Sequence, residues 1–518
     1  MSDALDRSVT VTELAAMDDT VDVRRHFATA FVGRALRGPL NTPVLVRSMT
    51  EFSRRFGGVW PKSSMGPAVQ QYFEHGGRRL YIVRVANGAR GARIQLQTNA
   101  DPLVLTAVDP GSAETLRVSV DYDRVAPGDD EHFNLTVQRL APGSEVLVDQ
   151  EIHNLLSCDS DSDQFVVDRL QDSALISATA PSSKARPLAT IGPHVHRGNG
   201  YVLPDRRGVD GAELSDYDLI GSAAENTGLF SLEGVNNLDV LYLPPIGRGR
   251  DIGPAATMAA DLFCRRRGAM LVVDPPLGWS SAEEALRGVD DQGFTSPNML
   301  SYFPRMLDRD NPQGGPRAMG GALAGLIGRA DERVGPWCDP SQLTFPINAR
   351  YRPTIAVEPE SAARLVRAGL NVLAAFQGVR ARFHGGVTLA RRNTFDMPLT
   401  RLSTRRLCLY VSNAVGQATR WAVFRDYGNH VTERVRDQVQ TFLTRLHTEG
   451  AFASDKFDVQ CQVMQDQSSG AHLRGLTIVI GFVPAGYTEA VWLTLHQDVQ
   501  GCHATKAAFT PSPNRIVR

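Results

Sequence analysis

Two nearly unbroken apolar runs constrain the fold of this chain more than any other feature. They are LDVLYLPP at residues 238–245 and AMLVVDPP at residues 269–276, and the segment between them, 254–268, has the spacing of an amphipathic helix. Strands that are covered on both faces are apolar along their whole length, and parallel neighbours need a crossover helix. The sequence therefore predicts a βαβ unit in a parallel sheet, and an α/β fold class (α+β multidomain).

Other segments extend this alternation of helices and strands. Residues 27–88 are expected to form a strand, two helices and a strand, and residues 361–376 are expected to form one further helix. In the C-terminal region, RRLCLYVSNA at 405–414 is predicted to be a strand. A long helix follows, with Val431 and Val435 at the start of its apolar face, and then two strands.

The texture of the sequence changes between residue 89 and about residue 180. Short alternating runs are separated by clusters of Asp, Gly, Pro and Ser; the runs are LVLTAV, LRVSVDY, FNLTVQRL, EVLVDQEI, FVVDRL and ALISATA. This pattern predicts strands, and so a β-rich domain inserted into the α/β body. Residues 180–210, rich in Pro, Gly, Arg and His, are interpreted as a linker.

Charge and cysteine content exclude several classes of protein. Lys plus Arg number 55 against 56 Asp plus Glu among 518 residues, which lacks the basic excess of a nucleic-acid coat. The six cysteines include no CxxC pair and are interpreted as reduced thiols of a cytosolic protein. The N-terminus has no apolar signal-peptide core, and the longest apolar stretch, 476–485, is about half the length of a spanning helix. We expect no membrane insertion.

One loop offers an enzymatic interpretation. Gly247, Gly249 and Gly253 lie between a predicted strand and a predicted helix, and Asp274 ends the next strand, as in a dinucleotide-binding enzyme. The spacing is GxGxxxG rather than GxGxxG, however, and two prolines separate the strand from the glycines. A glycine-rich loop capping the βαβ unit is the simpler interpretation, and the dinucleotide-binding enzyme is the alternative.

The sequence patterns for metal sites and for known catalytic motifs are incomplete or missing. Asp159, Asp161 and Asp163 alternate as in a calcium loop, but the later positions of that loop are not matched, so a solvated acidic turn is expected. His194 and His196 have no third ligand nearby in the sequence. Motifs of serine hydrolases, zinc proteases and P-loop enzymes are missing. We therefore expect no cofactor, no metal and no catalytic residue.

The chain nevertheless resembles one family over most of its length. Segments that are similar to contractile tail sheath proteins of phages and phage-like injection systems occur in the family's order; they are 31–58, 68–85, 133–140, 163–176, 208–245, 296–307, 320–337 and 421–452. Two family features differ. The PGVY-type opening is missing, and the WGARTL-type turn is replaced by FHGGVTLARR at 383–392.

The resemblance implies a domain plan. It consists of an N-terminal linker arm (1–20), a sheath α/β body in two parts (21–88 and 206–399), an inserted β-rich outer domain (89–205), a mixed-sheet C-terminal inner domain (400–503) and a C-terminal linker arm (504–518). It also implies a structural subunit rather than an enzyme, which polymerises around an inner tube and contracts to drive that tube through a target envelope. A cap or baseplate component on the same fold is the closest alternative.

The resemblance further implies the partners and the contact residues. Copies of the chain would stack as rings, of sixfold symmetry as in the family, and would associate with the tube, the baseplate and a terminal cap in the cytoplasm, without nucleic acid. The arm candidates, whose strands would add to a neighbour's sheet, are Val9, Val11, Leu14, Phe509, Ile516 and Val517. The candidates for contact with the inner tube are Arg434, Arg436 and Arg445 on the long C-terminal helix.

Overall fold

The computed structural model describes residues 27–141, 143–191, 200–247, 249–293, 295–339, 345–376, 380–390, 400–424, 429–465, 472–498 and 502–508. The chain divides into two compact units. The body unit comprises the described residues of Phe27–Ala330 and Pro340–Leu389, and the C-terminal unit comprises Asp331–Asp339 and the described residues from Ala390 onward.

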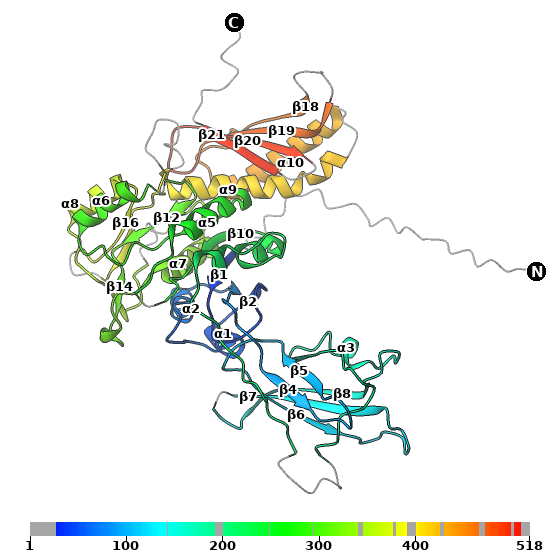
Figure 1. Cartoon of the computed structure of the whole chain (residues 1–518). Coiled ribbons are helices and arrows are strands. Elements are labelled where there is room, and N and C mark those ends of the chain that lie inside the picture. The colour runs from blue at the N-terminus through cyan, green and yellow to red at the C-terminus, as the bar shows by residue number, and fades with distance from the viewer. Residues whose placement is uncertain are drawn as a thin grey trace, which may run out of the picture. The chain divides into compact units, whose positions relative to one another are not determined.

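A six-stranded sheet organises the body unit (Figure 1). Its order is β12-β11-β10-β1-β3-β2, with β1 Ala28–Gly33, β2 Val44–Val46, β3 Leu80–Arg84, β10 Leu238–Tyr242, β11 Met270–Val272 and β12 Met299–Leu300. All pairs are parallel except β2 with β3. The central strand β1 is buried along its whole length, and Phe31 pairs with Tyr242 on one side and Ile82 on the other. The predicted parallel βαβ unit is confirmed by β10, α5 and β11.

The helices of this unit begin and end where local chemistry dictates. They are α1 Met49–Phe56, α2 Met65–Glu74, α4 Asp216–Ile220, η1 Gly228–Gly234, α5 Pro254–Arg267, α6 Ala282–Gln292, α7 Gly320–Arg333 and α8 Pro359–Arg367. In α1, the Ser48 hydroxyl accepts a hydrogen bond from the Glu51 amide at 3.1 Å, and Gly57 ends the helix in the left-handed conformation. Pro254 opens α5 and Gly268 closes it.

Helix α7 crosses α2 at close range because two glycines remove side chains from the contact. A Cβ atom at Gly321 would lie 2.2 Å from the carbonyl oxygen of Ala68, and one at Gly325 would lie 2.3 Å from that of Tyr72. No side chain fits at such distances. The alternation of glycine with apolar residues in 320–328 therefore serves helix packing on this side of the sheet.

One predicted helix is only half correct. The expected helix over 361–376 ends as α8 at Arg367, and Asn371–Ala374 form strand β16. Gly369 has a φ of 94°, which turns the chain out of the helix, and all four residues of β16 are buried. Strand β16 lies between β13 Tyr302–Phe303 and β17 Arg382–His384 in a small sheet, and β14 Met306–Asp308 pairs with β15 Tyr351–Pro353.

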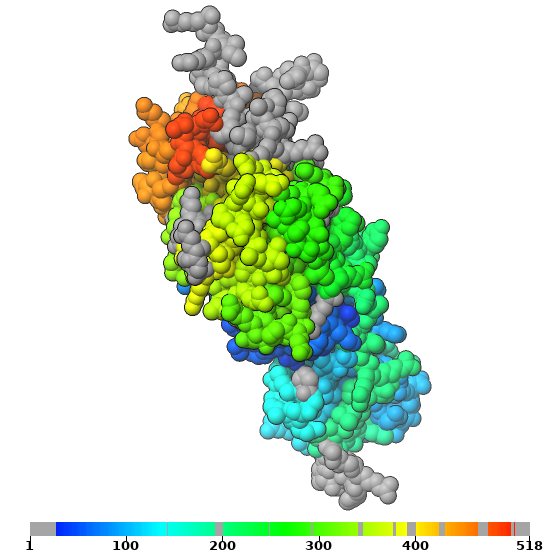
Figure 2. Space-filling view, turned by 90° about the vertical axis from the view of Figure 1, so that its left-hand side faces the viewer, coloured from blue at the N-terminus to red at the C-terminus, as the bar shows by residue number. Residues whose placement is uncertain are grey.

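The inserted domain contains two three-stranded antiparallel sheets around one apolar core. The sheets are β4-β5-β9 (Arg93–Leu96, Leu103–Ala107, Ile176–Ala178) and β6-β7-β8 (Thr115–Asp121, His132–Leu140, Leu147–Ser157). The run at 165–170, which was expected to be a strand, forms the one-turn helix α3 Val166–Arg169, and Val166 and Leu170 are both buried at helical spacing. Figure 2 shows this domain in cyan to blue-green. A bridge between Val118 and Val202 brings the chain near residue 200 beside β6.

The chain enters and leaves the inserted domain at adjacent points. Antiparallel bridges join Asn87 to Ala212, Arg90 to Val209 and Arg93 to Arg206. Just before this point lies Arg84, whose fully buried guanidinium donates to the carbonyl oxygens of Ala35, Gly38 and Pro110 at 3.1, 2.5 and 2.7 Å. Burial lowers the pKa of Arg84 to about 10, although nearby carboxylates, first Asp109, oppose that shift.

The C-terminal unit packs two long helices on a sheet of order β18-β19-β20-β21 (Figure 1). The described strands of this sheet are all antiparallel, whereas the resemblance implied a mixed sheet. Its elements are α9 Leu402–Ala418, η4 Arg420–Phe424, α10 Asn429–Thr448, β18 Asp458–Gln465, β19 His472–Phe482, β20 Val491–Asp498 and β21 Cys502–Ala508. The strand predicted at 405–414 is wrong, because these residues lie within α9. The helix is buried on most of its circumference, so its apolar residues occur in an unbroken run rather than at helical spacing.

A buried ion pair ties α9 to the segment 331–339 within the C-terminal unit. The guanidinium of Arg406 donates two hydrogen bonds to the carboxylate of Asp331, at 2.8 and 2.5 Å. The side chains are 0% and 1% exposed. This is the two-point geometry that favours Arg with a carboxylate.

Candidate assembly surfaces

The sheet of the C-terminal unit can accept further strands. Within the described residues, β18 pairs only with β19 and β21 pairs only with β20, so each of these two strands has an outer edge. Backbone groups on such an edge can form a ladder with an added strand. Strand β21 includes residues 504–508, the first part of the predicted C-terminal arm, and Leu495 of β20 pairs with Ala504.

The arm candidates themselves cannot be placed. Val9, Val11, Leu14, Phe509, Ile516 and Val517 all lie outside the described residues.

The three arginines proposed to contact the tube do not share one face of α10. Arg434 and Arg445 are 11 positions apart in the helix (445 − 434), which at about 100° per residue brings them within about 20° of each other. Arg436 lies about 160° away from Arg434 by the same geometry. The buried face, which includes Val435, Val439 and Leu446, lies between these two flanks. The structure therefore groups Arg434 with Arg445 and separates Arg436 from them.

The three arginines make different contacts on the surface of α10. Arg434 lies over the ring of Trp421, 4.8 Å from its centroid. Arg445 is 3.9 Å from the Glu449 carboxylate and its side chain is 63% exposed, and Arg436 lies at the same distance from Asp437. Exposed pairs of this kind contribute about 0–1 kcal/mol. The guanidinium groups of Arg436 and Arg445 thus remain accessible to a partner.

Between the two arginine flanks, the solvent side of α10 carries the exposed residues Glu433 and Asp437 in its first half and three threonines in its second half. The hydroxyls of Thr441, Thr444 and Thr448 donate to carbonyl oxygens of the same helix, at 2.8, 2.9 and 2.7 Å. The proton of each of these hydroxyls is therefore used within the helix.

The glycine loop after β10 is not arranged for a pyrophosphate. The carboxylate of Asp216 accepts hydrogen bonds from the amides of Gly253 and Ala256, at 3.0 and 3.1 Å. It thus occupies the N-terminus of α5, where a phosphate would bind in a dinucleotide site. A Cβ atom at Gly253 would lie 2.2 Å from this carboxylate, so the glycine makes room for Asp216.

Asp274 is engaged in a structural role. Its carboxylate accepts hydrogen bonds from the Tyr242 hydroxyl at 2.5 Å and from the amides of Met319 and Gly320 at 3.0 Å, at the start of α7. Burial raises the pKa of Asp274, and the Arg305 guanidinium opposes that shift. The cavity beside it measures about 230 Å³, which is below the usual range of ligand pockets, roughly 300–1,000 Å³. Of the residues that suggested a dinucleotide site, Gly253 and Asp274 therefore stabilise the fold.

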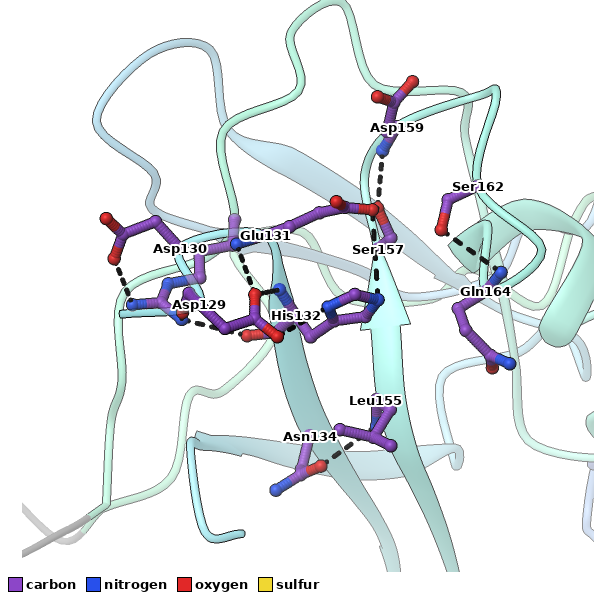
Figure 3. Close-up of polar contacts among 11 residues, drawn as sticks. Asp129, Asp130, Glu131, His132, Asn134, Leu155, Ser157, Asp159, Ser162 and Gln164 are labelled. Atoms are coloured by element: carbon purple, nitrogen blue, oxygen red, sulfur yellow. Dashed lines mark hydrogen bonds and ion pairs between the residues drawn. The ribbon is translucent and has the colours of Figure 1, made fainter. Parts of the chain in front are cut away.

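The acidic turn of the inserted domain is also structural (Figure 3). The Lys184 ammonium lies 2.6 Å from the carboxylate of Asp159 and 3.5 Å from that of Asp161, and the hydrogen bond from Lys184 lowers the pKa of Asp159. The Ser157 hydroxyl joins the amide of Asp159 to the carboxylate of Glu131. Across the described residues, no group of three His, Cys, Asp or Glu side chains could hold a metal ion. His194 and His196 lie outside them.

None of the helices that the structure describes combines the length and the apolar character needed to cross a bilayer.

Comparisons with known proteins identify structures with the same fold. No protein-family model matches the sequence, and no curated protein is significantly similar to it. Solved structures do match. The sheath tail protein from Listeria innocua is similar at a TM-score of 0.63 with 12% identity, over 91% of this chain and 95% of that one.

Two further structures come from injection particles. The sheath complex of the extracellular contractile injection system PVC, in its contracted state, gives a TM-score of 0.52 with 12% identity, over 94% of this chain and 96% of that one. A chain of the sixfold-symmetrised baseplate of the anti-feeding prophage gives a TM-score of 0.50 with 14% identity, over 94% of this chain and 97% of that one. The chain therefore has the fold of contractile sheath proteins, which confirms the predicted fold class and the resemblance to that family.

Proposed function

We propose that the chain is a structural, non-enzymatic subunit of a contractile sheath that polymerises around an inner tube and contracts to drive the tube through a target envelope. The observation that carries this proposal is the match of more than nine-tenths of the chain to sheath structures, inserted domain and C-terminal unit included. Gly253 and Asp274, two of the residues that suggested a dinucleotide site, are occupied by intramolecular contacts, which supports a structural role over an enzymatic one.

The proposed partners are further copies of the chain, an inner tube, a baseplate and a terminal cap, in rings of sixfold symmetry. Assembly takes place in the cytoplasm, and the product is a phage tail or a phage-tail-like particle. The arms, which carry Val9, Val11, Leu14, Phe509, Ile516 and Val517, add strands to the sheets of neighbouring C-terminal units. Support comes from the two outer edges of the β18–β21 sheet. Main-chain ladders would keep copies linked while their bodies reorient.

Contraction needs no nucleotide hydrolysis under this proposal. Subunits assembled in a metastable extended lattice release free energy when they move to a lattice with better contacts. The energy is stored at assembly, and the chain needs only surfaces that can exchange partners.

Electron microscopy tests the proposal directly. Co-expression of the full chain with its tube protein is expected to give striated cylinders. Deletion of residues 1–14 is expected to abolish cylinders, because the strand donor is removed, while the circular dichroism spectrum of the monomer stays unchanged.

Two outcomes would contradict parts of the proposal. Monodisperse monomers in the presence of the tube would overturn the sheath function, and normal cylinders from the deletion variant would overturn the arm assignment.

The match to a baseplate chain favours a second candidate, a sheath-like cap or baseplate component. Single layers at tube ends, without cylinders, would identify it.

We expect the tube to lie against the flank of α10 that carries Arg434 and Arg445. The double variant Arg434→Glu/Arg445→Glu is expected to reduce the amount of tube that sediments with the sheath, since two attractive charges become repulsive. Arg436→Glu on the opposite flank is the matched control and should sediment with as much tube as the unmodified chain. Equal loss from both variants would contradict the assignment of this flank. Raised salt should weaken the same contact.

A further inference from the structure

Helix α5 exposes large apolar side chains on its solvent side. Met258 is 63% exposed and Leu262 is 70% exposed, and they are four positions apart, so they lie side by side on the helix. The opposite side, with Ala260, Phe263 and Cys264, is buried against the sheet. Tyr217 is 79% exposed on α4, whose first residue, Asp216, caps α5. We call Tyr217, Met258 and Leu262 the α5 patch.

Of the described helices, only α4 and α5 expose large apolar side chains. Helix α8, by contrast, has Glu360, Arg364 and Arg367 on its solvent side, which is the usual arrangement for a helix that faces water. A single exposed apolar residue is common on protein surfaces, but adjacent large ones mark an interaction site.

The C-terminal end of helix α5, next to the α5 patch, is basic. Arg265, Arg266 and Arg267 form the last turn of α5, and within the described part of the chain they pair with two carboxylates, Asp261 and Glu233. The side chains of Arg265 and Arg266 remain 48% and 51% exposed. One positive charge is therefore left over beside the apolar residues.

Helix α6 of the same body unit has the complementary charge. Glu283, Arg287 and Asp290 follow one exposed stripe at helical spacing, and Asp291 lies next to it. No ion pair to Glu283, Asp290 or Asp291 occurs among the described residues. The stripe therefore has an excess of negative charge on a different helix from the α5 patch (Figure 1).

We propose that the α5 patch of one copy docks on the α6 stripe of a second copy, with Arg265 and Arg266 facing Glu283 and Asp290. This inference rests on the proposed sheath function and specifies a contact within the assembly. Because the two surfaces differ, each copy offers one of them to the next, and such contacts repeat into rings or helices rather than closing as a dimer. The charges set the register and the apolar side chains supply the buried area.

Cross-linking between copies tests the contact. Two single variants, Leu262→Cys and Asp290→Cys, are assembled separately and as a mixture, and then oxidised. Only the mixture is expected to give a disulfide-linked pair of chains on a denaturing gel, which excludes a bond within one chain. The control mixture pairs Leu262→Cys with Ala363→Cys on α8 and should give none.

A second variant separates this contact from folding and from the proposed function. Met258→Gln/Leu262→Gln should raise the concentration needed for cylinders by about tenfold or more and leave the monomer's melting temperature unchanged. Cylinders that form normally from this variant and show no Leu262–Asp290 cross-link overturn the contact while the sheath function stands. Failure of the unmodified chain to assemble overturns the sheath function, and cross-linking of the concentrated monomers then decides the contact by itself.

Discussion

Asp331→Asn is expected to destabilise the C-terminal unit by about 3–5 kcal/mol, the usual cost of removing one member of a buried ion pair. The substitution leaves the guanidinium of Arg406 charged on a side chain that is 0% exposed. The asparagine keeps the size of the side chain and one oxygen acceptor, so the loss measures the charge rather than a cavity. Of the contacts described for this unit, this one should give the largest effect.

Hydrogen exchange in α9 and α10 is the suitable measurement, because unfolding of a chain with two units is not a single two-state transition. Protection in these helices should fall together, while β1 and β10 of the body unit keep theirs. The double variant Asp331→Leu/Arg406→Met is the control. It removes both charges and should recover most of the stability, since apolar replacements of buried ion pairs are often neutral or stabilising. Equal losses in the single and double variants would contradict the electrostatic explanation.

Arg84→Leu is expected to destabilise the body unit by at least about 3 kcal/mol, because it leaves the buried carbonyl oxygens of Ala35, Gly38 and Pro110 without their donor. It also removes a positive charge near Asp109 and Glu114, whose pKa values burial already raises. Ala35 and Gly38 follow β1, whereas Pro110 belongs to the inserted domain. A single side chain therefore fixes the body to the start of the insert.

Limited proteolysis with urea denaturation checks this prediction. Cleavage in Arg84→Leu should begin in the segments that flank the inserted domain, near residues 86–92 and 206–212, before the rest of the body unit is cut. Arg84→Lys should recover little, because an ammonium cannot reach three carbonyl groups as a planar guanidinium does. Arg367→Leu, at an exposed position of α8, serves as the control and should change stability by less than about 0.5 kcal/mol. A similarly small change in Arg84→Leu would show that the carbonyl groups find other partners.

Much of the architecture could be predicted from periodicity. The runs at 238–245 and 269–276 are apolar throughout because their strands are covered on both faces, and the inserted domain alternates because its strands have one buried face. The failure at 405–414 has the same physical origin as the success at 238–245. A helix buried on nearly all sides gives the same unbroken apolar run as a buried strand, and only its length, 17 residues, distinguishes it.

The candidate sites were harder to predict because they depend on contacts distant in sequence. The role of Gly253 follows from Asp216, which lies 37 positions earlier (253 − 216), and no local pattern joins them. Helix geometry could have separated Arg436 from Arg434 and Arg445 on sequence alone. The spacing of Met258 and Leu262 was also visible, but their exposure became clear only when the structure showed which side of α5 packs on the sheet. The periodicity of one sequence does not show which of its surfaces contact another copy.

The paired bridges at the base of the inserted domain have a consequence for engineering. Arg90 pairs with Val209, so the outgoing and returning chains are one strand spacing apart, about 5 Å. A foreign domain whose own ends lie at a similar separation can be grafted between these positions without stretching the six-stranded sheet. If the chain assembles as proposed, a domain inserted at this junction, such as an epitope or an enzyme, would be displayed in a regular array with one copy for each subunit.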